Sequence, residues 1–204
     1  MDNLRLPKQY FSYSQFSLWL KNKDGYRKRY YLNEKQIETP EMLFGKKIAK
    51  ILEDKRRLRK VKRYSRSEYP IKCFLENVPV IGYIDSFDPE QKRFIEFKTG
   101  HTEWDAVRVA KHEQLPFYSL LIETAHKEVT DLCSLVWLQT RFTTIKRKFD
   151  GIQLSAQSRE LELTKRFEIF PRIIKKWERK KMREKILSVA QEISNDYANF
   201  KKSN

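Results

Sequence analysis

The sequence of 204 residues has little glycine and proline, five and seven residues, and no repeated or compositionally biased segment. Collagen-like, low-complexity and repeat architectures are therefore excluded. No segment approaches the roughly 18 apolar residues of a membrane span, and the amino terminus MDNLRLPKQY lacks an apolar signal core. We therefore expect no membrane partner, and a single domain over residues 1–204 with a core at about 10–150 and a helical C-terminal segment at about 156–204.

Cysteine is also scarce, with only Cys73 and Cys133. Two cysteines make no disulfide framework, and neither has the neighbouring Cys or His ligands of a zinc or iron–sulfur site. Both lie in apolar segments, KCFL and LCSLVWL, where we expect buried thiols in strands. The sequence thus predicts no iron–sulfur cluster and a cytoplasmic location, intracellular and reducing.

Positive charge is what the sequence has in excess. Its 43 Lys and Arg against 27 Asp and Glu give a formal net charge of +16, and ten basic residues fall within each of the segments 46–63 and 165–185. Clustered cations neutralise phosphates and release counterions, which favours a nucleic acid partner over a merely solvated face or a membrane surface. The candidate nucleic-acid-binding residues are Lys46, Lys47, Lys50, Arg56, Arg57, Arg59, Lys175 and Lys176.

The expected elements alternate between helices and strands in a way that is typical of one sheet flanked by helices. Helix signals begin at Ser12 or Ser14 and at Thr39-Pro40-Glu41, and helical patterns cover 104–125 and 158–200, the last with a break near Pro171. Strands are expected in YPIKCFL, VPVIGYIDSF, KRFIEFKTG, VTDLCSLVWLQT and RFTTIKRKF, with Asp88 to Gln91 as a turn. The fold class is therefore α/β.

Candidate chemistry lies in the hairpin formed by the second and third strands. A symmetric turn pairs residues whose numbers sum to 181, which puts Asp85 opposite Glu96 and projects Lys98 to the same face as Glu96. Opposed carboxylates need a cation between them, and hard oxygen ligands suit Mg²⁺ or Mn²⁺. Lys98 could then meet a phosphate or orient the attacking water. The alternative is a surface hairpin whose charges simply face water.

Over most of residues 10–125 the sequence resembles the PD-(D/E)xK nuclease superfamily, specifically its RecB-like exonuclease branch. YFSYSQFSLWL with YRKRYYL is similar to the opening helix of that branch, and LFGKKIAKILE at 43–53 to its first motif. GYID and IEFKTG match the second and third motifs, and QLPFY at 114–118 matches the later Gln-x-x-x-Tyr motif. The resemblance implies a single nuclease domain with a restriction-endonuclease-like core, a central mixed β-sheet flanked by helices, and a helical C-terminal segment.

The resemblance also implies roles for individual residues. Asp85, Glu96 and the backbone carbonyl of Phe97 would bind the catalytic Mg²⁺ or Mn²⁺, and Lys98 would be the catalytic lysine. Gln114 and Tyr118, one helical turn apart, would complete the catalytic set by contacting the site or the nucleic acid, with plain helix packing as the alternative. Ala49 stands where the branch carries a His, so Glu53 is a further candidate metal ligand. His101, His112 and His126 match no ligand spacing, and we expect His112 to be exposed.

The function implied is a metal-dependent DNA nuclease, an exonuclease that hydrolyses phosphodiester bonds in DNA repair, recombination or the processing of phage or defence DNA. DNA is the expected partner, single- or double-stranded. One alternative is a catalytically inactive nucleic-acid-binding or assembly subunit of the same fold, which Ala49 favours and the intact Asp85, Glu96 and Lys98 oppose. A third possibility is an enzyme directed at RNA.

Overall fold

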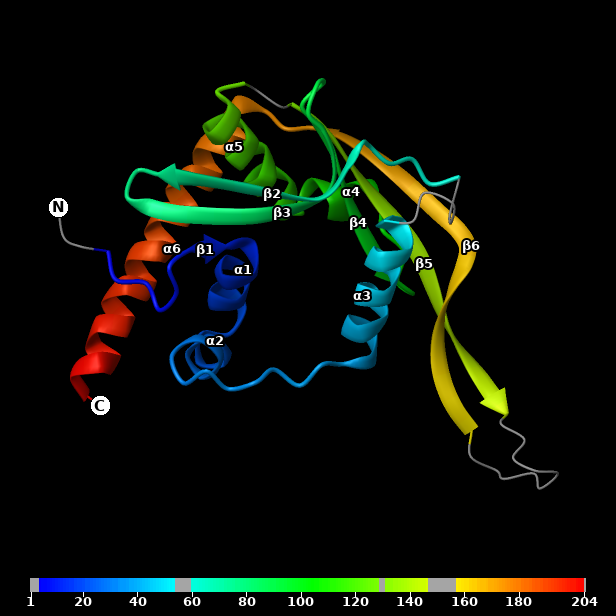
Figure 1. Cartoon of the computed structure of the whole chain (residues 1–204), viewed down its shortest axis with the longest axis horizontal. Coiled ribbons are helices and arrows are strands. Elements are labelled where there is room, and N and C mark those ends of the chain that lie inside the picture. Colours follow the sequence, from blue (N-terminus) through cyan, green and yellow to red (C-terminus); the bar gives the residue numbers. More distant parts are fainter. Residues whose placement is uncertain (1–3, 54–59, 129–130, 147–156, 204) are drawn as a thin grey trace.

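The computed structural model describes residues 4–53, 60–128, 131–146 and 157–203 (Figure 1). Within them a six-stranded mixed sheet has the order β1-β3-β4-β5-β6, with β2 paired to β3. Its strands are β1 (Phe11–Ser12), β2 (Arg66–Leu75), β3 (Val78–Asp88), β4 (Arg93–Gly100), β5 (Leu132–Lys146) and β6 (Gln157–Ile173). The helices are α1 (Tyr13–Lys21), α2 (Lys23–Tyr30), α3 (Pro40–Glu53), α4 (Ala106–Ala110), α5 (Gln114–His126) and α6 (Lys176–Ser203).

Helices cover both faces of the sheet, as expected. Side chains alternate along β5, so Val136 and Leu138 pack with Ile48 and Leu52 of α3, whereas Leu135 and Trp137 join the larger core formed with α1, α5 and α6. A strand buried on both faces has no polar face, which accounts for the uninterrupted apolar run LVWL in β5. The predicted central mixed sheet flanked by helices is therefore confirmed.

The parallel pairing of β4 with β5 determines where α5 lies. Parallel neighbours need a long crossover, and here it is made by α4 and α5. One helix was expected over 104–125, but residues 111–113 separate two. A continuous helix would need Pro116 to donate a backbone hydrogen bond to His112, which proline cannot do. The chain instead starts α5 at Gln114, so that Pro116 falls in the first turn, where no donor is required.

The helix expected over 158–200 is wrong in its first part. Residues 157–173 form β6, antiparallel to β5, and α6 begins only at Lys176. Leu161 and Leu163 alternate with Glu160 and Glu162, which is the two-residue period of a strand. Two strands were expected at 129–140 and 141–149, but residues 132–146 form one continuous strand, β5, while 129–130 and 147–149 lie outside the described residues. Figure 1 shows the ribbon of β5 with β6 extending past α3.

The local signals at the starts of the helices are confirmed. Ser12 caps α1 by accepting a hydrogen bond from the Gln15 backbone N–H, and Thr39 accepts one from that of Met42 ahead of Pro40. Both cysteines are free and lie in strands, but only Cys133 is fully buried and Cys73 is partly exposed. No helix in the described ranges has the length and apolar character needed to cross a membrane.

Candidate active site

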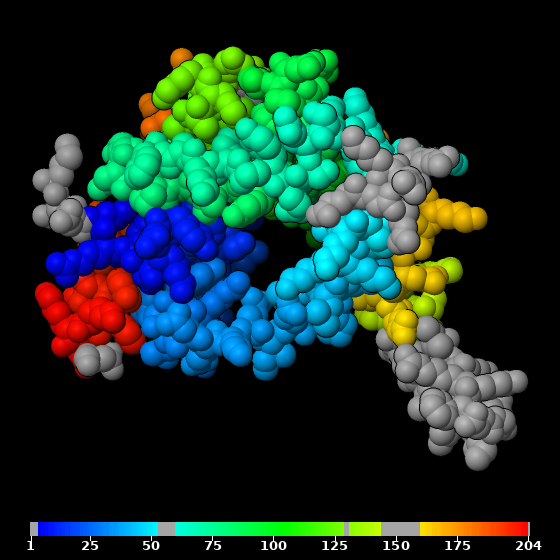
Figure 2. Space-filling view, viewed as in Figure 1, coloured from blue at the N-terminus to red at the C-terminus, as the bar shows by residue number. Residues whose placement is uncertain are grey.

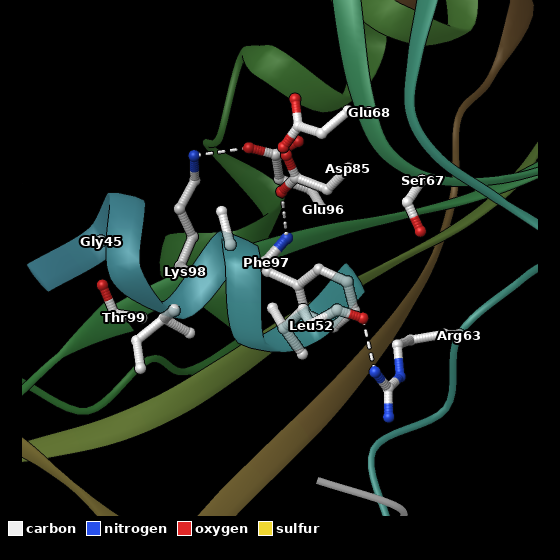
Figure 3. A pocket seen from close by; sticks show the side chains of 12 residues that line it. Gly45, Leu52, Arg63, Ser67, Glu68, Asp85, Glu96, Phe97, Lys98 and Thr99 are labelled. Carbon is white, nitrogen blue, oxygen red and sulfur yellow. Dashed lines mark hydrogen bonds and ion pairs between the residues drawn. The ribbon is translucent and has the colours of Figure 1, made fainter. Parts of the chain in front are cut away.

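A cavity of about 330 Å³ lies between α3 and strands β2 to β4. Figure 2 shows the molecule hollowed between α1, the β2–β3 hairpin and α3. Helix α3 contributes Gly45, Ile48, Ala49 and Leu52 to the cavity lining, and the strands bring their polar side chains to it (Figure 3). The lining residues from outside α3 are Arg63, Ser67, Glu68, Asp85, Glu96, Phe97, Lys98 and Thr99.

The β3–β4 hairpin has the register that its sequence predicts. Its ladder pairs are Ser86 with Ile95, Phe87 with Phe94, and Asp88 with Arg93, and the numbers of each pair sum to 181. The Asp88 carboxylate fixes the turn by accepting hydrogen bonds from the Glu90 and Gln91 backbone N–H groups. Beyond the ladder, Asp85 Oδ2 accepts a hydrogen bond of 2.7 Å from the Phe97 backbone N–H. The same hairpin therefore brings Asp85 beside Glu96.

Lys98 links these carboxylates to α5. Its Nζ donates to Glu96 Oε1 at 2.6 Å and to Gln114 Oε1 at 2.7 Å, and Gln114 Nε2 donates to the Tyr118 hydroxyl at 3.0 Å. The structure thus joins Glu96, Lys98, Gln114 and Tyr118 in one chain of hydrogen bonds. Gln114 and Tyr118 share a helix face, as their spacing predicts, and both are buried.

The carboxylates are held in an environment that disfavours their charge. Glu96 is only 2 % exposed, and its Oε2 is buried without a hydrogen-bond partner. Burial, together with the neighbouring Glu96, raises the pKa of Asp85 to about 8, and burial likewise raises the pKa of Glu96 against the opposing effect of Lys98. At neutral pH the two carboxylates therefore need either a shared proton or an added cation.

Gly82 in the GYID segment has a packing role. A Cβ atom at this position would lie 2.9 Å from Cε1 and 3.2 Å from Cδ1 of Tyr118. Only a residue without a side chain lets the Tyr118 ring pack directly on β3. Glycine here thus helps to place the partner of Gln114.

Glu68 is a site residue that the sequence analysis missed. In the β2–β3 ladder Ser67 pairs with Ser86 and Tyr69 with Ile84, so Glu68 lies opposite Asp85. Figure 3 shows its carboxylate close to those of Asp85 and Glu96, and its charge raises the pKa of Glu96. The backbone at Glu68 has a φ of 46°, a left-handed conformation that is uncommon for residues other than glycine. Extending the register to the preceding hairpin, whose turn contains Asn77, would have found it.

The other predicted site residues are placed as follows. Ala49 lines the cavity, but Glu53 is the last residue of α3 and its side chain lies outside the described part, as do Arg56, Arg57 and Arg59. Lys46, Lys47 and Lys50 are exposed on α3, with Lys46 paired to Glu38. Lys175 and Lys176 are exposed at the start of α6, on the opposite face of the sheet from α3, so the two predicted basic groups are separate.

His112 is not exposed, contrary to expectation. Its ring packs edge-on to that of Trp104, with 5.1 Å between the centroids, because the segment between α4 and α5 turns inward. Burial, together with the nearby positive charges of Lys98 and Arg172, lowers the pKa of His112 to about 4. The imidazole is therefore neutral at physiological pH. Neither His101 nor His126 lines the cavity.

The donor set fits a small divalent cation. No three His, Cys, Asp or Glu side chains in the described ranges are grouped so as to hold a metal as they stand. However, Mg²⁺ commonly uses only one or two carboxylates and takes its other ligands from water and substrate phosphate. Asp85 and Glu96 supply two carboxylates, and the unpartnered Glu96 Oε2 is a buried oxygen that a cation would satisfy.

Comparison with known proteins agrees with this geometry. No curated protein matches the sequence. Among solved structures, the crystal structure of a putative exonuclease from Eubacterium rectale has a TM-score of 0.56 and 10 % sequence identity, and covers 96 % of this chain and 82 % of its own. At that identity the likeness shows the restriction-endonuclease-like α/β fold. The sequence also matches the PD-(D/E)XK nuclease superfamily model over residues 8–203, so the chain belongs to that superfamily.

Proposed function

We propose that the protein is a divalent-metal-dependent deoxyribonuclease that hydrolyses phosphodiester bonds from DNA ends, as in the RecB-like exonuclease branch. The observation that carries the proposal is the buried Glu96 carboxylate, with one oxygen on Lys98 and the other unpartnered beside Asp85. The role that we propose for such an activity is in DNA repair, recombination or the processing of phage or defence DNA.

The residues that would hold Mg²⁺ or Mn²⁺ are Asp85, Glu96 and the Phe97 carbonyl, with Glu68 and Glu53 as further candidates. A bound divalent ion would stabilise the charge that develops on the scissile phosphate and would make an attacking water more acidic. The chain itself fixes the position of Lys98. An ammonium has three donors, and two are used on Glu96 and Gln114, which leaves one for a phosphate oxygen or the attacking water.

The cleavage step is an in-line displacement at phosphorus. The water oxygen loses a proton to solvent and forms the new P–O bond, the bond to the leaving sugar oxygen breaks, and that oxygen takes up a proton from solvent, so no proton is gained or lost overall. Tyr118 acts as a positioning residue, because its hydroxyl accepts from the same Gln114 amide whose oxygen holds Lys98. Hydrogen bonds that are fixed before the reaction need no reorganisation in the transition state.

The alternative function is that of a nucleic-acid-binding or assembly subunit that has lost catalysis. Ala49 favours it, because alanine cannot bind a metal and α3 places this residue at the cavity wall. The arrangement of Asp85, Glu96 and Lys98 argues against it. Opposed carboxylates are destabilising without a cation, and an inactive scaffold gains nothing by holding them together.

The test is a digestion of linear, nicked and closed-circular DNA with Mg²⁺ or Mn²⁺, with EDTA as the metal-free control. We expect the wild type to degrade linear DNA and to spare closed circles. Lys98→Ala should lower the rate by roughly 10²–10⁴-fold, the range for loss of one proton-transfer or charge-stabilising group. Lys72→Ala, which removes an exposed lysine of β2 that does not line the cavity, is the matched control.

Calorimetry with Mn²⁺ separates the two functions. We expect Asp85→Asn to lose the metal and Lys98→Ala to retain it. A wild-type protein that binds no Mn²⁺ and releases no nucleotides with either ion would refute the nuclease and leave the assembly subunit.

A further inference from the structure

Trp177 is an exposed tryptophan in the first turn of α6. Its side chain is 60 % exposed, whereas the other three tryptophans are at most 8 % exposed. Two surface hollows meet at this residue, one of about 670 Å³ between α5 and α6 and one of about 180 Å³ beside the start of α5. The indole therefore forms a wall between two concave surfaces, and the catalytic mechanism above does not use it.

The hollows around Trp177 are rich in cations that have no acidic partner. Nine cationic side chains line the two hollows, and within the described part of the chain no carboxylate lies within ion-pair distance of six of them. These are Lys127, Lys176, Lys180 and Arg183 in the larger hollow, and Lys111 and Lys181 in the smaller.

The acids of the same hollows are already neutralised. Glu123 lies 2.9 Å from Arg179 Nε, Glu178 pairs with Arg172, and Glu113 pairs with Lys185. The charge left over is positive, so both hollows are complementary to a polyanion.

A third hollow continues this surface towards the catalytic residues. It has a volume of about 610 Å³, adjoins the smaller hollow through Lys111 and His112, and is also lined by Lys21 and Arg108. Lys111 and His112 lie three and two residues before Gln114, which accepts a hydrogen bond from Lys98. The three hollows therefore lead from Trp177 to the N-terminal end of α5, next to the catalytic lysine.

We propose that this surface binds a single strand of nucleic acid, with an unpaired base stacked on Trp177 and the backbone phosphates on the surrounding lysines. Aromatic platforms combined with cationic grooves are how proteins hold single strands without reading their sequence. A duplex keeps its base faces stacked inside and cannot present one to the indole. If the protein cleaves this strand, the strand would approach the catalytic cavity from the side of Gln114. This approach to the cavity rests on the proposed nuclease function.

Binding is tested without cleavage, by fluorescence anisotropy of a labelled oligothymidylate of twenty nucleotides in EDTA. Trp177→Ala should weaken single-strand binding by roughly 5- to 100-fold and leave the binding of duplex DNA unchanged, whereas Trp177→Phe should retain most of the affinity. Phe74→Ala is the matched control, because Phe74 is 69 % exposed on β2 and lines none of these hollows. Lys180→Gln and Lys181→Gln should each reduce the slope of log affinity against log salt by about 0.7.

Several results would overturn the inference. One is an unchanged affinity of Trp177→Ala for the oligothymidylate, and another is an equal loss on single-stranded and duplex DNA. A third is a wild type that does not bind the oligothymidylate. Circular dichroism and thermal unfolding show whether each variant is folded.

The proposed nuclease function and the proposed single-strand site can be refuted independently of each other. Binding through Trp177 by a protein that cuts nothing with either metal refutes only the nuclease. Cleavage together with an unchanged affinity of Trp177→Ala refutes only the single-strand site.

Discussion

Replacing Gly82 by alanine would place a methyl group against the ring of Tyr118. The new Cβ would lie 2.9 Å from Cε1 and 3.2 Å from Cδ1, where carbon atoms normally approach to about 3.5–4.0 Å. Tyr118 is only 6 % exposed, and its hydroxyl accepts from Gln114, so the ring cannot withdraw without breaking that hydrogen bond. Either the ring or the strand must therefore move.

The magnitude follows from two opposing effects. Overpacking a buried site costs about 1–3 kcal/mol. Alanine also restricts the unfolded chain more than glycine does, which raises the free energy of unfolding by about 0.5–1 kcal/mol. The backbone at Gly82 has no positive φ, so alanine would not strain it. We expect Gly82→Ala to lower the free energy of unfolding by about 1–2 kcal/mol. Cleavage should fall as well, because the displaced ring no longer supports Gln114 and Lys98.

Gly45→Ala is the matched control. Gly45 lies inside α3, and the nearest atom to an added Cβ is Thr99 Oγ1 at 3.9 Å, an ordinary contact. In a helix interior alanine is favoured over glycine by up to about 1 kcal/mol, so this variant should be as stable as the wild type or more stable. Replacement by alanine is thus expected to lower the free energy of unfolding at Gly82 and to maintain or raise it at Gly45.

Urea unfolding of Gly82→Ala, Tyr118→Ala and the double variant measures the effect. With the ring removed, the added methyl group has nothing to clash with, so the double variant should show a coupling energy of about 1–2 kcal/mol. A Gly82→Ala variant as stable as the wild type would refute the packing argument. So would an equal penalty in the presence and absence of the Tyr118 ring.

Two further predictions concern Glu68 and His112. Glu68→Gln should weaken Mn²⁺ binding by about tenfold in calorimetry, because Glu68 faces Asp85 across the β2–β3 ladder. Glu90→Gln, at an exposed position, is the control and should leave Mn²⁺ binding unchanged. Equal Mn²⁺ affinities of Glu68→Gln and the wild type would exclude Glu68 from the site. Between about pH 6.5 and pH 4 the unfolded chain takes up a proton that the half-buried His112 of the folded chain does not bind, so stability should fall by about 1–3 kcal/mol as the pH drops. His112→Asn should lack this decrease in urea unfolding at pH 4 to 7, and parallel curves would contradict it.

The candidate site was predictable where it depends on neighbouring segments. The Asp88 to Gln91 turn is local chemistry, and a two-residue side-chain period converts its position into the pairing of Asp85 with Glu96. The spacing of Gln114 and Tyr118 likewise follows from helix geometry. The contact between α5 and β4 could not be predicted in this way, because no local pattern shows which helix end meets Lys98. We expected it only from the resemblance to known nucleases.

The incorrect predictions concern residues whose conformation or surroundings depend on segments that are distant in the sequence. Residues 157–173 carry enough charge to look helical, but β5 offers them a complete ladder, and pairing outweighs local propensity. His112 looks exposed beside Glu113, yet the break before Pro116 turns it onto Trp104. Glu68 was missed because its importance comes from a second hairpin, seen only when the registers of both hairpins are combined.

The distribution of charge links the site to the substrate. Glu68 lies opposite Asp85 and Asp85 beside Glu96, so three adjacent strands carry carboxylates at the same level in a chain with a net charge of +16. A basic protein can neutralise a carboxylate with its own side chains, as this one does for Glu113, Glu123 and Glu178 around Trp177. At the cavity, Lys98 takes one oxygen of Glu96 and leaves the other without a partner. The unpartnered Glu96 oxygen beside Asp85 is the arrangement expected if the missing positive charge is a metal ion that arrives with, or ahead of, a phosphate backbone.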